Sequence, residues 1–174
     1  MVNIGQVDLN VIEESLLRLG GGNHADNMKR LSRFQCHCYV LLSEKEFLGL
    51  IFLQNDEVTP IAPRGHDRKL QTVAERAIRL GQPTLSPNWK LSENLDLMRK
   101  KLETGSIFGE TLTICEARDG EEAHGPWYLQ DGSHRALAYA TLVLLHEETY
   151  SERTAYCSMS QPMYLRSLAL PGNL

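Results

Sequence analysis

Residues 127–140 constrain the fold of this chain more than any other stretch, because a strand, a tight turn and a helix follow one another there without a spacer. The first four residues are typical of a strand, Asp131-Gly132 is typical of a turn, and an apolar helix with a polar start follows. Such a turn aims the N–H groups of the first helical turn, and the positive end of the helix dipole, at whatever lies above. His134 and Arg135 add side-chain donors at the same place. The stretch therefore predicts a binding site for phosphate or another anion.

The composition is that of an ordinary globular protein, with 174 residues, of which 42% are hydrophobic and 23% charged. This length predicts a single domain over residues 1–174 with a core of its own. The start of the chain lacks the features of a signal peptide, and no apolar run approaches the ~20 residues that cross a membrane. Four cysteines do not suggest a disulfide scaffold. We therefore expect a cytoplasmic protein with reduced thiols and no membrane partner.

Charge is distributed unevenly along the chain. The net charge of −4 argues against attraction of the whole molecule to nucleic acid. Residues 59–105, however, hold nine Lys or Arg against five Asp or Glu. A basic surface there, including Lys100 and Lys101, is a candidate contact for DNA phosphates, although such a surface is more often only solvated.

Periodicity and turn signals predict one α/β unit, a small mixed sheet flanked by helices. Helices are expected over residues 8–19, 67–80, 92–104 and 133–148. Strands are expected over residues 34–42, 107–116 and 127–130. Ser92 is the expected N-cap of its helix. The apolar segment 46–53 is expected either to pair with 34–42 as a hairpin or to form a helix, and the end of the tail is expected to be poorly ordered.

The order of helix, strand, charged turn, strand and Asp-Gly-Ser-His-Arg before an apolar helix resembles the ParB/sulfiredoxin superfamily. Members of that superfamily carry a Gly-x-x-Arg turn at a helix start, and this turn binds nucleotide phosphates. The matching tetrad here is Gly132-Ser133-His134-Arg135, and the resemblance covers residues 92–148. It implies a single ParB/sulfiredoxin-like domain that binds ATP or another nucleotide together with Mg²⁺. Residues 1–60 would then be an additional helix and strands.

Ser133 separates the chain from two branches of that superfamily. It stands where sulfiredoxins carry their nucleophilic cysteine, so repair of sulfinic acid is not expected. It also replaces an acidic residue of ParB, and no helix-turn-helix domain is evident behind it. A single domain of this size is similar to the plasmid fertility inhibition factors, a group that includes the oncogenic suppression protein. That likeness implies an ATPase, and a possible DNase, that inhibits conjugation, with DNA and a conjugation or secretion-system protein as partners.

Each residue of the turn has a binding role and a structural alternative. Arg135 can present a bidentate fork to phosphate oxygens, or form an ion pair with the acidic loop of residues 116–122. His134 can donate to a phosphate or transfer a proton, or it can serve as a cap or surface group. Asp131 can hold Mg²⁺ or cap the helix. Gly132 either allows a ligand to approach the backbone closely or adopts a positive φ, and the Ser133 hydroxyl can donate to a phosphate.

Hydrolysis also needs a group that orients water, and three acids are the candidates: Glu93, Glu110 and Glu116. Glu116 ends the strand next to the turn, so it is the expected catalytic acid beside His134 and Arg135. A metal-dependent nucleotide hydrolase is thus the leading functional hypothesis. The alternatives are a non-catalytic regulatory module that binds nucleotide or DNA, and a small-molecule kinase such as a serine kinase.

Cys36-His37-Cys38 raises the separate possibility of a metal site. Residues two apart in a strand point to the same face, so both thiols are able to bind one ion. Zinc, however, needs a full set of ligands at recognisable spacing, and Cys115 and Cys157 stand alone in the sequence. A core strand is therefore the preferred interpretation.

Overall fold

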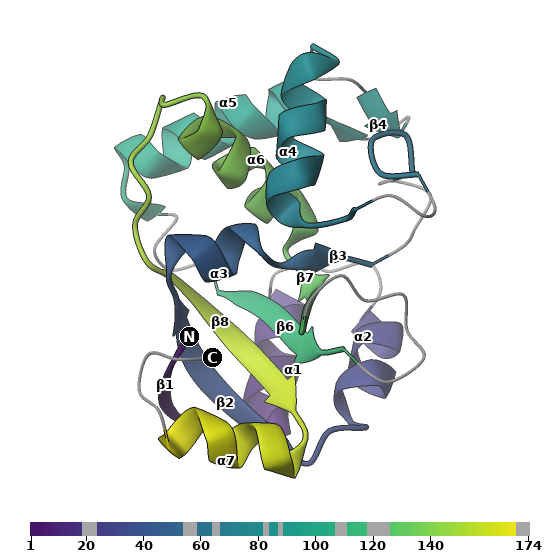
Figure 1. The fold of residues 1–174 in the computed structure, drawn as a ribbon, viewed down its shortest axis with the longest axis vertical. Helices are drawn as coiled ribbons and strands as arrows, with labels where there is room; N and C mark the ends of the chain where they lie inside the picture. Colours follow the sequence, from purple (N-terminus) through teal and green to yellow (C-terminus); the bar gives the residue numbers. More distant parts are fainter. Residues whose placement is uncertain are drawn as a thin grey trace.

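A six-stranded mixed sheet forms the centre of the protein, with helices on both of its faces (Figure 1). The computed structural model describes residues 1–18, 24–53, 59–63, 67–81, 84–86, 89–106, 111–117 and 126–169. The strands of the sheet, in spatial order, are β1 (Val2–Gln6), β2 (Cys36–Leu42), β8 (Arg153–Met159), β6 (Leu112–Glu116), β7 (Trp127–Asp131) and β3 (Ile51–Phe52). The pairs β8/β6 and β7/β3 are parallel and the others antiparallel. A separate two-stranded sheet consists of β4 (Thr84–Ser86) and β5 (Trp89–Lys90).

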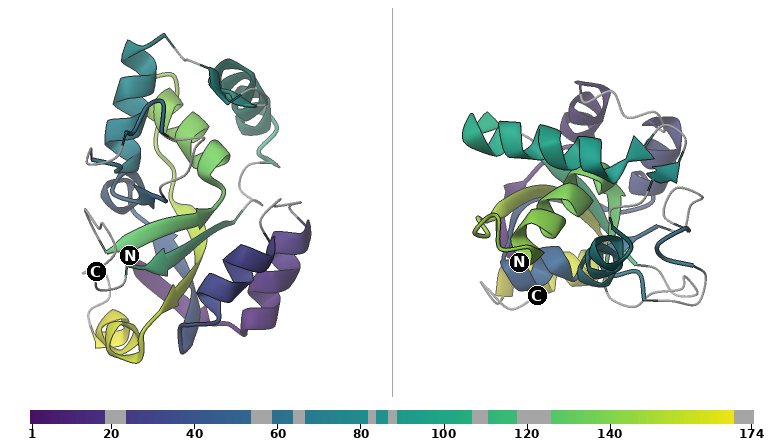
Figure 2. Two further views of the ribbon diagram at one scale, coloured as in Figure 1. Left: turned by 90° about the vertical axis from the view of Figure 1, so that its right-hand side faces the viewer. Right: turned by 90° about the horizontal axis from the view of Figure 1, so that it is seen from above.

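Helices cover the two faces of the sheet unequally. They are α1 (Leu9–Arg18), α2 (His24–Leu31), α3 (Glu44–Leu48), α4 (Leu70–Arg79), α5 (Leu91–Glu103), α6 (Ser133–Leu144) and α7 (Gln161–Ala169). Figure 2 shows α1 and α2 on one side of the sheet and α7 on the other. Ile12, Leu16 and Leu31 of α1 and α2 form a small core with Tyr128, while α3 to α6 share the larger core. The predicted α/β architecture, a mixed sheet flanked by helices, is confirmed.

Strand β2 places fully buried side chains on one face of the sheet and half-buried side chains on the other. Its residues alternate between fully buried side chains, including Cys38 and Val40, and half-buried ones, including His37 and Tyr39. The buried set belongs to the larger core, and the half-buried set faces the other side. The strand predicted over 34–42 is therefore confirmed, with its first two residues outside it.

Helix α6 lies at the centre of the helical layer, because it is apolar on every side. Residues 136–143 are buried without interruption, and α6 packs against both α4 and α5 (Figure 1). Its N-terminus meets the end of β7, and the strand and helix predicted within 127–140 are both present. The helix ends at Leu144 rather than at residue 148, and His146 follows with a positive φ of 57°.

Of the two alternatives for segment 46–53, the hairpin with 34–42 is wrong, and the helix is found in part, as α3 over Glu44–Leu48. The sequence Ser43-x-x-Glu46 is a capping box, in which the backbone N–H and the hydroxyl of Ser43 donate to Glu46 Oε2 at 2.8 and 2.6 Å. The box starts helix α3, and this helix turns the chain away from β2. Strand β3 then pairs in parallel with β7, where Ile51 lies opposite Tyr128.

Other predicted boundaries also differ from the structure. Helix α5 starts at Leu91 with Lys90 as its N-cap, so Ser92 lies inside the helix and does not cap it. No strand is predicted over 153–159, yet β8 lies in the middle of the sheet. The buried positions of β8 include the small residues Ala155 and Cys157, which weaken its hydrophobic alternation. Residues 107–110 of one predicted strand, and the last residues of the tail, lie outside the described part of the chain. Within that part, every helix is too short or too polar to cross a bilayer.

Candidate functional site

The turn between β7 and α6 depends on Gly132. This residue is the N-cap of α6 and has a left-handed backbone with φ = 87° and ψ = 18°. Its carbonyl accepts the first helical hydrogen bond, from the N–H of Ala136, at 2.8 Å. A Cβ at this position would lie 2.6 Å from Leu112 Cδ2 and 3.0 Å from Arg135 Nη2. Both the conformation and the surrounding space therefore require glycine.

Arg135 and Asp131 form an ion pair across the turn. Arg135 Nη2 donates to Asp131 Oδ2 at 3.1 Å, and the two side chains are only 20% and 16% exposed. The carboxylate of Asp131 thus orients the guanidinium, and the N-cap of α6 is Gly132 and not Asp131. The capping role considered for Asp131 is therefore wrong. Of the acidic loop that was the other possible partner of Arg135, residues 118–122 lie outside the described residues.

Ser133 and His134 occupy the first turn of α6 and are half-buried. The N–H groups of a first helical turn have no carbonyl acceptors within their own helix, so they favour an anion nearby. All five residues of the predicted phosphate turn, 131–135, thus lie at the junction of β7 and α6. Whether they bind a ligand stays a prediction.

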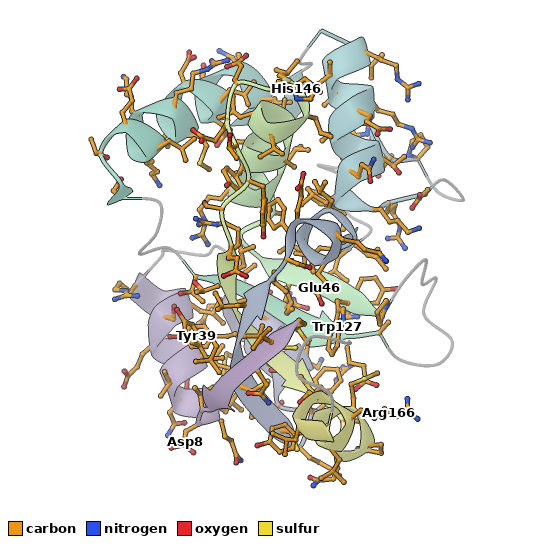
Figure 3. The ribbon with its side chains drawn as sticks, turned by 60° about the vertical axis from the view of Figure 1, so that its left-hand side comes forward. Asp8, Tyr39, Glu46, Trp127, His146 and Arg166 are labelled. Atoms are coloured by element: carbon orange, nitrogen blue, oxygen red, sulfur yellow. The ribbon has the colours of Figure 1, made fainter. Side chains whose placement is uncertain are left out.

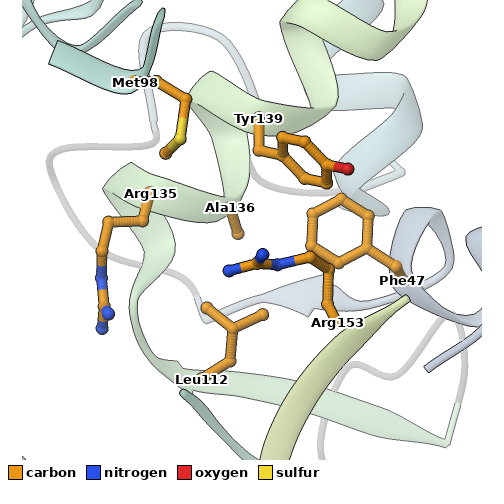
Figure 4. Close-up of a pocket in the computed structure, with 7 residues that line it drawn as sticks. All are labelled: Phe47, Met98, Leu112, Arg135, Ala136, Tyr139 and Arg153. Atoms are coloured by element: carbon orange, nitrogen blue, oxygen red, sulfur yellow. The ribbon is translucent and has the colours of Figure 1, made fainter. Parts of the chain in front are cut away.

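A small recess lies beside the first turns of α6, where Arg135, Ala136 and Tyr139 line it (Figure 4). Its cavity volume is about 10 Å³, which is room for roughly one water molecule. The lining residues are Phe47, Met98, Leu112, Arg135, Ala136, Tyr139 and Arg153. Two of them are arginines, from α6 and from β8, while the remainder supply apolar or aromatic surface. Because no strand is predicted over 153–159, nothing in the sequence pointed to Arg153.

Arg153 is held among aromatic rings. It is only 5% exposed, and its Cζ lies 5.2 Å from the centre of the Tyr139 ring, a cation–π contact. Phe47 lies 5.6 Å from both Tyr139 and Tyr150, measured between ring centres. The aromatic cluster of Phe47, Tyr139 and Tyr150 thus forms the wall behind the guanidinium of Arg153.

Hydrogen bonds fix this aromatic cluster to the backbone. Tyr150 Oη donates to the carbonyl of Leu42 at 2.6 Å and accepts from the backbone N–H of Arg153 at 3.3 Å. Tyr139 Oη accepts from the backbone N–H of Ser151 at 2.8 Å. Burial raises the pKa of the Tyr150 hydroxyl well above its ordinary value, so it remains a neutral donor. The start of β8 is therefore held rigidly.

Glu116, the expected catalytic acid, does not lie beside the turn. Strands β6 and β7 are antiparallel, with Thr113 opposite Asp131 and Glu116 opposite Trp127. Glu116 consequently lies about 10 Å along the sheet from the end where the turn begins. Its Oε2 accepts from the backbone N–H of Ser160 at 2.7 Å. The expected position of Glu116 beside the turn is wrong. Because β6 and β7 are antiparallel, the last residue of β6 lies opposite the first residue of β7, whereas the turn follows the last residue of β7.

Of the other two acids, only Glu93 lies within the described residues. Glu93 lies in the exposed first turn of α5 and pairs with Lys90 at 3.0 Å. Glu110 lies outside the described residues. Among the described residues, Asp131 is the carboxylate that pairs with the turn's Arg135.

The donor set around Asp131 does not fit a protein-held Mg²⁺ site. Its carboxylate already pairs with Arg135, and a neighbouring guanidinium repels a second cation. Across the described ranges, no group of three or more His, Cys, Asp or Glu side chains could hold a metal ion. Mg²⁺ bound through the phosphates of a nucleotide stays a prediction.

The Cys36-His37-Cys38 segment is part of the core. Cys36 and Cys38 are 4% and 0% exposed, and Cys36 Sγ donates to Gln161 Oε1 at 3.1 Å. His37 faces the other side of the sheet, where its Nδ1 lies 2.8 Å from Ser158 Oγ. Burial lowers the pKa of His37, which favours its neutral form. The two cysteines and the histidine therefore lie on opposite faces, as expected for a core strand.

The basic surface is partly neutralised. Arg99 forms ion pairs with Asp96 and Glu147, each at 2.8 Å. Lys100 and Lys101 lie in the last turn of α5. A DNA contact at these lysines stays a prediction.

Comparisons with protein families, curated proteins and solved structures found no match for this chain.

Proposed function

We propose that the protein binds the phosphate groups of a nucleotide such as ATP at the turn of residues 131–135. One observation carries the proposal: the left-handed Gly132 places the N-terminus of a twelve-residue helix and the Arg135 guanidinium at the same half-buried position. The helix dipole and a guanidinium both favour an oxyanion there. The likeness of Gly132-Ser133-His134-Arg135 to the ParB/sulfiredoxin turn supports the same ligand.

The ion pair within the turn is compatible with phosphate binding. A guanidinium carries several N–H donors in a rigid fork, so a bond to Asp131 can coexist with a contact to phosphate. Asp131 then acts as a positioning residue that orients Arg135. Ser133 and His134 would contribute their first-turn N–H groups and their side-chain donors.

Binding is better supported than hydrolysis. Glu116, the expected catalytic acid, lies at the far end of the β6/β7 pair. A non-catalytic module that binds nucleotide is therefore the second candidate function, favoured by that observation. If the protein is an ATPase, His134 is the residue for proton transfer, since an imidazole can both accept and donate a proton. Nuclease activity, conjugation inhibition and a serine kinase reaction are supported by the superfamily resemblance alone.

Calorimetric titration of the purified protein with ATP tests the binding site. Arg135→Ala should weaken ATP binding by about tenfold or more, the loss expected for a charge-assisted hydrogen bond. Arg166→Ala is the matched control, because Arg166 is an exposed arginine on α7 (Figure 3) and should leave the affinity unchanged. An ATP affinity unaltered by Arg135→Ala would refute the site. Phosphate release from bound ATP then separates the hydrolase from the binding module.

A further inference from the structure

We propose that Cys38 and Cys157 form a reversible disulfide when the protein meets a small neutral oxidant such as hydrogen peroxide. This inference goes beyond the proposed function and does not depend on it. Its basis is the pairing of β2 with β8, two neighbouring strands of the central sheet (Figure 1), which places the two thiols opposite each other.

The strand register brings these two cysteines within the range of a disulfide. Cys38 lies opposite Cys157 in the antiparallel β2/β8 pair, and both side chains belong to the larger core. The carbonyl of His37 accepts from the N–H of Val7 on the β1 side, so the backbone groups of Cys38 point towards β8. Cys38 and Cys157 are therefore a hydrogen-bonded pair, whose Cα atoms are about 5.5 Å apart. A disulfide joins Cα atoms that are about 4.4–6.8 Å apart.

The thiol of Cys38 already points across the strand pair. Its Sγ lies 3.7 Å from the carbonyl oxygen of Cys157. The Cβ atoms of directly opposite residues are about 4.5–5.5 Å apart, whereas a disulfide needs about 3.5–4.5 Å. The two strands therefore have to approach each other slightly when the bond forms. The strain that results makes the bond easier to reduce, which is why we expect it to be reversible.

The same register excludes the other two cysteines. Cys36 and Cys38 are two residues apart in one strand, which separates their side chains by about 6.6 Å. Cys36 lies opposite Met159, so it is only a diagonal neighbour of Cys157, at about 7–8 Å. Cys115 belongs to the smaller core, on the other face of the sheet. Cys38 with Cys157 is thus the pair that the fold prepares for a bond.

The two thiols are suited to different steps of the reaction. A hydrogen bond from the Cys157 thiol lowers the pKa of Cys38, although burial opposes this effect. Burial raises the pKa of Cys157 well above its ordinary value. Because the thiolate is the nucleophile, Cys38 is the sulfur that reacts first, and Cys157 is the thiol that completes the bond. Both are fully buried, so the oxidant has to be small and uncharged.

The oxidation balances with one molecule of hydrogen peroxide. The Cys38 thiolate attacks one peroxide oxygen, the O–O bond breaks, and the second oxygen leaves as hydroxide, which takes up a proton to become water. Cys38 is then a sulfenic acid. The sulfur of Cys157 attacks it, the S–O bond breaks, and the second water leaves as the disulfide forms. The two thiols lose two electrons in total, and the peroxide gains them.

Peptide mass spectrometry of the wild-type chain tests this inference without any variant. The native protein is treated with hydrogen peroxide and is then denatured and alkylated. Of the four cysteines, two should lose their alkylation and appear as a peptide linked through Cys38 and Cys157, while Cys36 and Cys115 stay alkylated. Dithiothreitol should restore alkylation at all four. The same treatment of the urea-denatured chain, where the register is lost, should give mixed pairings.

Two serine variants identify the sulfurs. Cys157→Ser should abolish the linked peptide and leave a sulfenic acid on Cys38 that dimedone captures. Cys36→Ser is the matched control, because it removes a buried thiol of the same strand and should retain the linked peptide. Circular dichroism checks that both variants are folded.

Three results would overturn the inference. The first is a native protein that keeps all four thiols in peroxide while the denatured chain loses them. The second is a linkage through Cys36 or Cys115 in the native chain. The third is oxidation of Cys38 to a sulfinic acid with no linkage to Cys157.

Discussion

Substitution of Gly132 by alanine tests the geometry on which the candidate site depends. The alanine would have to adopt φ = 87°, and its Cβ would lie 2.6 Å from Leu112 Cδ2. The left-handed backbone costs about 1–2 kcal/mol for a residue with a Cβ. Displacement of Leu112, which is 3% exposed and packed in the core, adds about 1–3 kcal/mol. We therefore expect Gly132→Ala to lower the free energy of unfolding by about 2–5 kcal/mol.

Thermal unfolding followed by circular dichroism, together with urea titration, measures this loss. For a chain of 174 residues, each kcal/mol corresponds to a decrease in Tm of about 2–4 °C. Gly105→Ala is the matched control, since Gly105 has φ = 67° but no heavy atom lies within 4 Å of the position that its Cβ would occupy. It should lose only the conformational part, about 1–2 kcal/mol.

The difference between the two glycine variants isolates the contact with Leu112. If Gly132→Ala and Gly105→Ala are equally stable, the close approach of Leu112 to the turn is not real. A double-mutant cycle with Leu112→Ala provides the second check, because removal of the obstructing methyl groups should recover about 1–3 kcal/mol of the loss. Strict additivity of the two substitutions would contradict the steric argument.

Two further predictions concern the aromatic cluster and the thiols. Tyr150→Phe should lower the free energy of unfolding by about 1–3 kcal/mol in urea titration, because the N–H of Arg153 and the carbonyl of Leu42 lose their partner. Since the pKa of the Tyr150 hydroxyl is raised in the folded state, the stabilising effect of Tyr150 should be complete below about pH 10 and lost as pH rises further. Tyr150→Phe should therefore flatten the decline of Tm at alkaline pH. An equally steep decline in the variant would contradict this. All four cysteines are buried, so a thiol reagent should label none rapidly in the native protein and all four after denaturation; fast native labelling would refute their burial.

Local signals predicted the elements that carry the turn. A run of apolar residues long enough for a buried helix, preceded by Asp-Gly, placed α6 and its start within a few residues of the observed ones. Alternation placed β2, since its buried side chains include the bulky Val40 and Leu42. The same reasoning failed for β8, where Ala155 and Cys157 occupy core positions and leave little hydrophobic contrast with Thr154.

Positions across the sheet escaped prediction because they depend on strand register. Glu116 precedes the turn by only fifteen residues in the chain, yet the antiparallel pairing of β6 with β7 moves it to the opposite end. Arg153 follows the turn in the chain and returns to it, because β8 inserts between β2 and β6. Neither placement can be read from spacing, since strand order is decided by how separate segments pack.

The sequence by itself determined the strand, the left-handed glycine turn and the helix of residues 127–144, because local backbone preference and helical periodicity act over a few neighbouring residues. Only the tertiary structure decided which charges face that turn. In the folded chain Asp131 pairs with Arg135, Glu116 lies at the opposite end of the β6/β7 pair, and Arg153 lines the same recess as Arg135. The reason is that sheet register and burial in a shared core bring together residues that are far apart in the chain.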